Sequence, residues 1–414
     1  MKLCRGSLPL LGLLVSLWDA SSQTLVLTNF TRLSNGAVQV QAVGPPQMVF
    51  SFQTSSDLMN WRTLDFTNSP SGVATFADNY LAPATASSSN RYYRGRLDAP
   101  NTTVVVTNYH NWSNCLLLRN GVAEVDIVPA IGRIMQFRFL GATNGPFFEN
   151  TNMFGQQPSA TQWNTAGAFG GDKVWPSPQS AWPAANPSGV FQPPRAFDST
   201  NFWAEVVNDT VVMTGPVDAT IYGMYEVRSI SLHPTEAIMR VTSAFVKTTG
   251  ANVTTGVWSI TQVQDAQEVF VPVPQQTVFP PLGYTTALGS VPPSLTVSNG
   301  LISFVRPAAE DTKIGNDAGA LLWVGANSAL LIESARIPGA LKSSYPDGGC
   351  SAEVYTDENP TPYIEMEILA PMVALSTNLT NSSVTSIATA NTVYSLLYRT
   401  QPTPAAEADK YLLR

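Results

Sequence analysis

The sequence predicts an all-β protein, and three observations support this class. Charged residues make up only 12% of the 414 residues, whereas long helical proteins need many Glu, Lys and Arg. Short segments of alternating apolar and polar residues, separated by turn residues, follow one another along the chain. No long window has a convincing helical period, except residues 405–412 near the end. The hydrophobic fraction of 44% is ample for a large core and argues against disorder.

Composition also excludes several classes of function. The chain has 22 basic and 29 acidic residues and no cluster of Lys and Arg that could neutralise phosphates. It contains 2 histidines, which nearly excludes metal sites built on histidine. No phosphate-binding loop, zinc spacing or Ser-His-Asp grouping is visible. We therefore expect no nucleic-acid partner, no metal and no cofactor.

Residues 1–23 predict a signal peptide. Lys2 and Arg5 form a short basic region, residues 8–18 form an apolar run, and small residues follow at 20–22. A retained N-terminal anchor is the alternative, but a membrane-spanning helix needs about 20 apolar residues. No other stretch is long and apolar enough to cross a membrane. The sequence therefore predicts a secreted or periplasmic protein without a membrane span.

Export leaves two cysteines, Cys115 and Cys350, in the mature chain. An oxidising compartment permits a disulfide between them, but the distance between their Cα atoms cannot be read from sequence. Two buried free thiols are the alternative, and both possibilities stay open.

Residues 24–97 predict a small β-sandwich module. Strand patterns at 38–42, 47–52 and 73–76 are separated by Gly-Pro-Pro and Pro-Ser-Gly breaks. The motifs SSDL-x-x-W, F-x-D and YR-x-R begin at residues 55, 76 and 93, and they resemble those of small β-sandwich repeats appended to many exported bacterial proteins. We expect Leu58 and Trp61 to anchor the core, with sugar binding as the alternative role of Trp61. The module itself is expected to serve spacing or adhesion.

Residues 101–402 predict one large β-sandwich domain, followed by a C-terminal tail at 403–414. Asp98-Ala99-Pro100 interrupts two strand patterns and marks the boundary with the module. Turn residues between apolar runs predict five hairpins, whose turns lie at 120–121, 208–209, 233–234, 298–300 and 325–327. The domain contains more than a dozen strand candidates and no second clear linker.

Five motifs in the large domain carry a resemblance to a known family. They are PAIGRI at 129–134, GGDKVWPSPQ at 170–179, VWSITQV at 257–263, KIG at 313–315 and YIEMEILAP at 363–371. This series resembles an uncharacterised bacterial family marked by a GGDK-x-W-P-x-PQ loop, which is itself similar to galactose-mutarotase-like supersandwich domains. The resemblance implies a broad concave sheet face that binds carbohydrate. It implies that Gln136, Trp258, Gln262 and the glutamates of the last motif share this face.

The stretch between residues 161 and 195 independently indicates sugar binding. It contains Trp163, Trp175 and Trp182 and several prolines, which do not fit regular sheet. Indole faces stack on the apolar faces of sugar rings, and Trp175 is the preferred platform. Packing of the loop onto the sheet is the alternative.

Polar residues near this stretch are further candidates for binding the substrate. Asp172 and Lys173 either recognise sugar hydroxyls or pair with each other to pin the loop. Arg133 either faces the cleft or pairs with an acid, because buried Arg is rarely left unpaired. Gln179 closes the specific motif and completes the predicted binding set.

Glu365 and Glu367 are the candidate catalytic residues. They are two apart on a strand and so project from one face together with Tyr363. Their mutual repulsion is expected to raise one pKa and to suit that carboxyl for acid–base chemistry. In mutarotases a glutamate on a late strand is the general base, and Glu367 is slightly preferred for this role. A solvated outer face is the alternative.

The chain departs from mutarotases where their histidines should be. Phe169 precedes the two glycines of the loop, and the central strand at 258–262 contains no histidine. Histidine is the usual donor near neutral pH. We therefore favour an exported carbohydrate-binding protein. The alternatives are a carbohydrate-active enzyme, an epimerase or lyase with an atypical acid, and a structural surface protein.

Overall fold

The computed structural model describes residues 24–33, 37–78, 91–157, 169–185, 192–198, 200–337, 339–360 and 362–413. The predicted signal peptide and Trp163 lie outside these residues. Within them, strands dominate and the two α-helices are short, so the predicted all-β class is confirmed. Neither helix in the described part of the chain has the length and hydrophobicity needed to cross a membrane.

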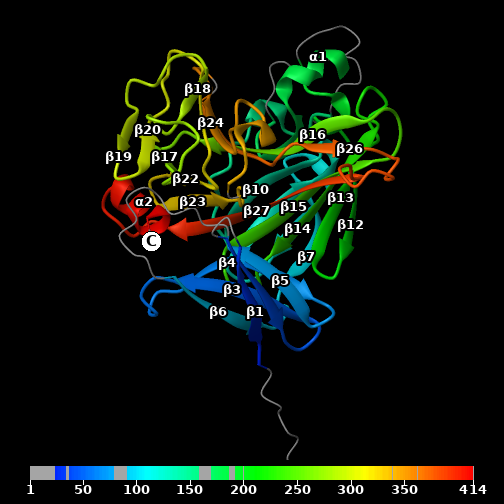
Figure 1. Cartoon of the computed structure of the whole chain (residues 1–414), viewed down its shortest axis with the longest axis vertical. Helices are drawn as coiled ribbons and strands as arrows, with labels where there is room; N and C mark the ends of the chain where they lie inside the picture. Colours follow the sequence, from blue (N-terminus) through cyan, green and yellow to red (C-terminus); the bar gives the residue numbers. More distant parts are fainter. Residues whose placement is uncertain are drawn as a thin grey trace, which may run out of the picture.

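Two three-stranded sheets form the N-terminal part, drawn in blue in Figure 1. Their strands, in spatial order, are β1 (Val26–Arg32), β2 (Val38–Val43) and β5 (Val73–Asp78), and then β4 (Arg62–Ser69), β3 (Met48–Ser55) and β6 (Tyr92–Asp98). Phe50, Phe52 and Phe76 are buried between them. Tyr93 stacks on Phe52 with 5.3 Å between ring centroids, so its ring points into this core.

The prediction that Leu58 anchors this core is wrong. Its side chain is 56% exposed, and its φ of 64° places it in a left-handed turn. The turn is held by Asp57 Oδ1, which accepts hydrogen bonds from the backbone N–H groups of Met59 and Asn60. Trp61 is only half-buried, and the guanidinium of Arg94 lies 4.3 Å from its ring centroid. Polar turn formation therefore outweighs the burial of one leucine here.

Two large antiparallel sheets form the rest of the structure (Figure 1). Among the described residues, the 11-stranded sheet has the order β18 (Thr285–Leu288), β21 (Thr312–Asn316), β24 (Ala352–Thr356), β25 (Tyr363–Leu369), β16 (Val253–Gln264), β11 (Asp172–Ser177), β10 (Arg133–Phe139), β9 (Ala123–Val128), β8 (Trp112–Arg119) and β7 (Thr103–Tyr109), with β26 (Val373–Leu375) paired to β16. The 10-stranded sheet has the order β12 (Trp203–Val207), β13 (Thr210–Thr214), β14 (Met224–Leu232), β15 (Ile238–Lys247), β27 (Ile387–Tyr398), β23 (Ser328–Glu333), β22 (Ala320–Val324), β17 (Glu268–Pro272), β20 (Leu301–Phe304) and β19 (Thr296–Ser298).

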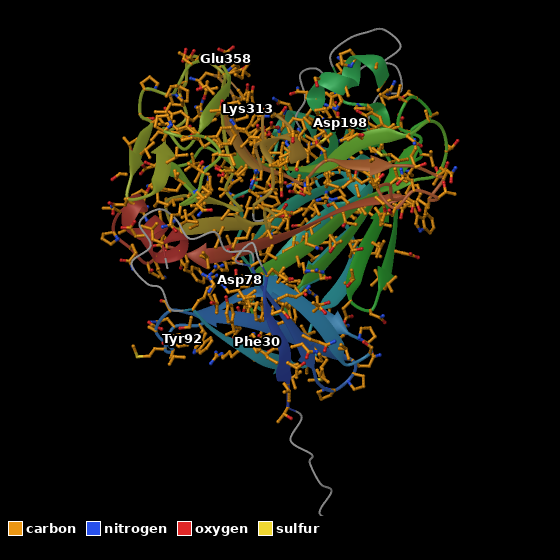
Figure 2. The ribbon with its side chains drawn as sticks, in the orientation of Figure 1. Phe30, Asp78, Tyr92, Asp198, Lys313 and Glu358 are labelled. Atoms are coloured by element: carbon orange, nitrogen blue, oxygen red, sulfur yellow. The ribbon has the colours of Figure 1, made fainter. Side chains whose placement is uncertain are left out.

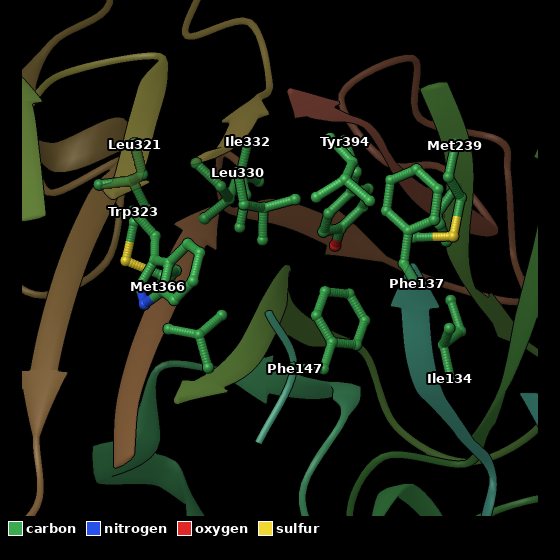
Figure 3. Packing of buried hydrophobic residues seen from close by; sticks show 14 of the residues in the cluster. Ile134, Phe137, Phe147, Met239, Leu321, Trp323, Leu330, Ile332, Met366 and Tyr394 are labelled. Carbon is green, nitrogen blue, oxygen red and sulfur yellow. The ribbon is translucent and has the colours of Figure 1, made fainter. Parts of the chain in front are cut away.

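The main hydrophobic core lies between these two sheets. Figure 3 shows side chains from both sheets meeting there, among them Ile134, Phe137 and Met366 from the first sheet and Met239 and Ile332 from the second. Alternate residues of each strand point into this core. The other face of the 11-stranded sheet is therefore free to carry polar groups, and we call it the outer face.

The five predicted hairpins are confirmed. They join β8 to β9, β12 to β13, β14 to β15, β19 to β20 and β22 to β23. The helical period near the end is also confirmed as α2 (Pro404–Leu412), whose N-cap Thr403 accepts a hydrogen bond from the Ala406 N–H. The remaining helical pieces are short: α1 (Trp182–Ala185), η1 (Pro129–Ile131), η2 (Thr151–Met153), η3 (Gln179–Ala181), η4 (Arg195–Phe197) and η5 (Lys342–Ser344).

The N-terminal sheets rest on the 10-stranded sheet through buried and charged contacts. Val49 and Phe66 pack against Ile238 and Val393. Ion pairs join Arg240 to Asp65 at 2.9 Å, and Arg62 to Glu333. Cys115 and Cys350 are both buried free thiols, which decides between the two possibilities that the sequence left open.

Candidate functional site

Two glycines shape the entry into β11, the strand that carries the GGDK motif. Gly170 and Gly171 have φ values of 96° and 71°, which L-residues with a side chain rarely adopt. A Cβ on Gly170 would lie 2.1 Å from the Phe148 carbonyl oxygen, and one on Gly171 would lie 2.3 Å from that of Ile134. The motif therefore needs glycine at both positions to bring β11 close against β10.

The residues that follow point to opposite faces of the sheet, as neighbours on a strand must. Asp172 is fully buried and faces the core, where it forms an ion pair with Arg228 of β14. Thr261 and Tyr394 each donate a hydrogen bond of 2.7 Å to Asp172 Oδ2. Asp172 thus joins the two sheets. Its predicted role in binding a substrate, and its predicted pairing with Lys173, are both wrong.

Lys173 lies on the outer face and belongs to a first polar group there. Its Nζ donates to Glu365 Oε1 at 3.1 Å, and Gln262 Nε2 donates to the same oxygen at 2.9 Å. All three residues are at most 8% exposed. The strand order β11–β16–β25 brings them together, because Gln262 and Glu365 are directly paired across β16 and β25.

A second polar group lies beside the first on the same face. Lys313 Nζ lies 2.8 Å from Glu353 and 2.8 Å from Glu367, so one ammonium group serves two carboxyl groups. Glu353 and Glu367 are directly paired across β24 and β25. Trp258 Nε1 donates a hydrogen bond of 2.8 Å to Glu367 Oε2. Both glutamates are fully buried, so the alternative of a solvated strand face is wrong for Glu367.

Three tryptophans pack beside these groups. The Trp175 ring meets the rings of Trp182 and Trp258 edge-on, at centroid distances of 5.1 Å and 5.7 Å. Lys173 Nζ lies 3.8 Å from the Trp175 ring centroid, whereas Lys313 Nζ lies 4.5 Å from that of Trp258. Trp258 is 2% exposed and stacks on Trp182, so it positions Glu367 and cannot offer an open face to a sugar. Trp175 is only partly buried and stays a candidate platform.

Arg133 and Gln179 complete the predicted set. Arg133 is 2% exposed, and it donates to the Gly170 carbonyl at 2.9 Å and to Asp198 at 3.2 Å, as expected of a buried arginine with an acidic partner. Asp198 also accepts a hydrogen bond from Trp175 Nε1 at 3.2 Å. Gln179 lies beyond the end of β11, at the start of η3, and no contact joins its side chain to the two polar groups within the described residues.

Gln136 does not join the cluster. Its amide donates hydrogen bonds of 3.2 Å to the Phe147 carbonyl and to Glu149. The other four residues expected to share a face, Trp258, Gln262, Glu365 and Glu367, do share it and form two hydrogen-bonded pairs. In Figure 2, Lys313 and Asp198 lie in the upper half, away from the N-terminal part that carries Phe30 and Tyr92.

Burial is the largest single influence on the pKa of Glu367, Lys173 and Lys313. It raises the pKa of Glu367 well above the usual range, against the opposing effect of Lys313, and Glu353 and then Glu365 raise it further. The repulsion between Glu365 and Glu367, which the sequence predicted as the origin of this rise, is a smaller cause. Burial lowers the pKa of Lys173, which Glu365 opposes. Burial also favours a lower pKa for Lys313, but Glu367 and Glu353 outweigh it and raise that pKa.

Sequence reasoning missed Glu353 and Lys313 as members of the site. Lys313 was part of a motif but had no role, and Glu353 was not singled out. A signal was present in residues 352–356, where Glu353 and Tyr355 alternate with buried Ala352, Val354 and Thr356. This is the same period of two that revealed Glu365 and Glu367.

Three buried oxygens of the cluster have neither a hydrogen-bond partner nor an ion pair within the described residues. They are Gln262 Oε1, Glu353 Oε1 and Glu367 Oε1, whereas Glu353 Oε2 contacts Lys313. Buried polar atoms are normally satisfied, so unsatisfied ones indicate a place for a bound molecule or water. No group of three or more Asp, Glu, His or Cys side chains in the described part of the chain is arranged to hold a metal ion.

A separate cavity of about 670 Å³ lies between the N-terminal part and α2. Trp61, Phe139, Tyr398 and Tyr411 line it, and its lining includes none of the residues of the two polar groups. This cavity is an alternative to the outer face as a ligand-binding site.

Comparison with known proteins places the chain in a family. Residues 114–385, more than half of the chain, match the family described as a domain of unknown function, DUF4380. The chain thus combines an all-β sandwich with a buried polar cluster on one sheet face, and it belongs to the DUF4380 family. No curated protein matches it.

Several solved structures are distantly similar. A TPR-domain containing protein from Parabacteroides distasonis has a TM-score of 0.43 and 13% identity; the match covers 78% of this chain and 51% of that one, about half its length. A putative aldose 1-epimerase from Escherichia coli K12 has a TM-score of 0.41 and 12% identity, with 72% and 100% covered. A galactose mutarotase-like protein from Lactobacillus casei has a TM-score of 0.42 and 8% identity, with 69% and 100% covered.

Proposed function

We propose that this chain is an exported carbohydrate-binding protein whose sugar site is the outer-face cluster around Glu365 and Glu367. The observation that carries the proposal is the pair of unsatisfied buried oxygens, Gln262 Oε1 and Glu367 Oε1, on the sheet face that also carries the partly exposed ring of Trp175. Sugars present hydroxyl groups to polar side chains and C–H faces to aromatic rings, and small-molecule sites commonly combine a few convergent polar groups with such rings.

The remaining parts of the proposal concern the organisation of the chain. Removal of residues 1–23 would release the mature protein to the periplasm or the exterior. Residues 24–97 and 101–402 would be its two domains, with residues 403–414 as the tail that carries α2. These assignments are supported by the basic and apolar pattern of the leader and by Ala99-Pro100 between β6 and β7.

The experiment is a glycan array with the mature chain, followed by titration calorimetry of the best glycan. We expect Glu365→Gln to weaken binding by about 10-fold or more, because Lys173 loses its counter-charge and the site loses its arrangement. The matched control is Glu205→Gln, since Glu205 is exposed on β12 of the other sheet. An array without any glycan bound would refute the function, whereas equal affinity of Glu365→Gln and wild type would refute the site.

A carbohydrate-active enzyme, of epimerase or lyase type, is the second candidate function. It is favoured by one observation, the different surroundings of the two carboxyl groups. Glu365 is paired with Lys173, whereas Glu367 shares Lys313 with another acid and has a raised pKa. Carboxyl groups in unlike surroundings can divide the roles of acid and base between them.

A further inference from the structure

The charged groups of the cluster around Glu365 and Glu367 are balanced, apart from one carboxyl group. Arg133 pairs with Asp198, and Lys173 pairs with Glu365. Lys313 contacts two acids, Glu353 and Glu367. Five of these residues are at most 8% exposed: Arg133, Lys173, Glu353, Glu365 and Glu367. Within the described residues, each cation that faces the site already has an acidic partner.

A buried charge without a counter-charge is unfavourable, and a carboxyl group in that position binds a proton instead. Lys313 can balance one carboxylate but not both. Because Glu353 and Glu367 face each other across β24 and β25, the two acids can share one proton next to the ammonium group. The buried interior shows the same arrangement a second time, where Arg228 lies between Asp172 and Glu226.

The unsatisfied oxygen of Glu367 indicates where the proton would be used. Glu367 Oε2 already receives the Trp258 N–H and contacts Lys313, whereas Oε1 has no partner within the described residues. A protonated carboxyl group is a hydrogen-bond donor as well as an acceptor. A proton on Oε1 therefore gives the site a neutral donor directed at a ligand oxygen.

We propose that the outer-face cluster selects uncharged sugars over uronic acids and sugar phosphates, and that one proton shared by Glu353 and Glu367 completes its charge balance and is donated from Glu367 Oε1 to a sugar oxygen when the ligand binds. An anionic sugar would bring a negative charge to a site whose cations are all paired. This inference rests on the proposed sugar site and names the class of sugar that it takes.

Several other groups face Glu367 and bear on the proton. Lys313, Glu353 and Glu365 act on Glu367 directly. Asp347 and Cys350 interact with Glu353, whereas Tyr355, Tyr363 and Lys173 interact with Glu365. Burial raises the pKa of Glu367 most, Lys313 opposes the rise, and Glu353 and Glu365 add to it, so the net effect favours the protonated form.

The first test compares ligands of equal shape and different charge. Titration calorimetry at pH 7 measures a neutral sugar that binds the mature chain, its uronic acid and its phosphate ester. We expect the two anionic sugars to bind at least about 10-fold more weakly. Glu365→Gln frees Lys173 and should narrow or reverse that preference, whereas Glu205→Gln should not change it. Equal or tighter binding of the anionic sugars to wild type would overturn the inference, and so would tighter binding of an amino sugar.

The second test needs no ligand, so it separates the inference from the proposed function. Difference infrared spectroscopy of the mature chain at pH 7 records the carbonyl stretching band of protonated carboxyl groups. We expect wild type minus Glu367→Gln to contain such a band, and wild type minus Glu205→Gln to lack it. If the band is present but no sugar binds, the shared proton is supported and the proposed sugar-binding function is refuted. Absence of the band from the first difference would refute the shared proton, whatever the sugar results.

Discussion

Trp258 Nε1 donates a hydrogen bond of 2.8 Å to Glu367 Oε2, and this contact joins the two central strands of the outer face, β16 and β25. It ties the acid to a ring that is itself stacked on Trp182. Glu367 is therefore held in a fixed, buried position. Its pKa is raised more by burial than by its neighbour Glu365.

The first prediction concerns pH and stability. A carboxyl group whose pKa is raised in the folded state binds more protons there than in the unfolded chain. Its contribution to the free energy of unfolding is fully present below the pKa of the unfolded chain, about 4.3, and is lost as the pH rises through the pKa of the folded state. We expect the free energy of unfolding to fall from pH 5 to pH 9 and to fall less in Glu367→Gln, as measured by urea unfolding.

Glu226 is a second buried carboxyl group that contributes to the pH dependence of the free energy of unfolding. Burial raises its pKa to about 8, Arg228 opposes the rise, and Asp172 adds to it. Glu226 should therefore keep part of the pH dependence in Glu367→Gln, and the double variant with Glu226→Gln should lose more of it. Identical pH profiles for wild type and Glu367→Gln would contradict this account of Glu367.

The second prediction concerns Asp172. Asp172→Ala leaves Arg228 buried between the sheets without its partner, and breaking a buried ion pair in this way costs about 3–5 kcal/mol. Chemical unfolding should measure that loss, while sugar affinity of the folded variant should stay within about 3-fold of wild type. Asp209→Asn, in the exposed turn between β12 and β13, is the control and should cost little. If Asp172→Ala lost sugar affinity while its free energy of unfolding was unchanged, Asp172 would be a ligand-binding residue after all.

The third prediction concerns Trp175. Its partly exposed ring should contribute about 1–3 kcal/mol to sugar binding, the range of truncation costs at interface hot spots. Trp175→Ala should therefore weaken binding, and it should also lower the melting temperature somewhat, because the ring packs on Trp182 and Trp258. Trp203→Ala, which removes a 73% exposed ring from β12, should change neither quantity much. Intact affinity with a sharp drop in melting temperature would make Trp175 a core residue only.

The fourth prediction separates a binder from an enzyme. We expect the purified mature chain to show no anomer interconversion and no polysaccharide cleavage, because neither histidine lies at the cluster. His233 contacts Ser51 at 2.9 Å on the N-terminal side, and His110 stacks on Phe154 at 3.8 Å. Nuclear magnetic resonance of sugar anomers would detect turnover. Turnover that falls about 10²-fold in Glu367→Gln, with affinity retained, would overturn the binder assignment.

Much of the fold could be predicted because its signals are local. Each confirmed hairpin has turn residues between two alternating segments, such as Asn120-Gly121 between β8 and β9. The shared face of Glu365 and Glu367 likewise follows from a period of two. Such signals need only neighbours in the sequence.

The site could be predicted only in part because its contacts are non-local. Lys313 and Glu353 reach Glu367 through the strand order β21–β24–β25, which no short motif specifies. Asp172 and Lys173 are neighbours on a strand and so point to opposite faces of the sheet, but the sequence did not show which of them faces the core. Asp172 faces the core because Arg228 and Tyr394 of the opposite sheet bind its carboxylate there.

The most direct test of the central claim is a crystal structure of the mature chain with an uncharged glycan identified on the array. We predict a sugar on the outer face, with one oxygen within hydrogen-bond distance of Glu367 Oε1 or of Glu365, and with Trp175 against the sugar ring. A sugar bound instead in the cavity of about 670 Å³ that Trp61 and Tyr398 line, with the outer face empty, would contradict the account.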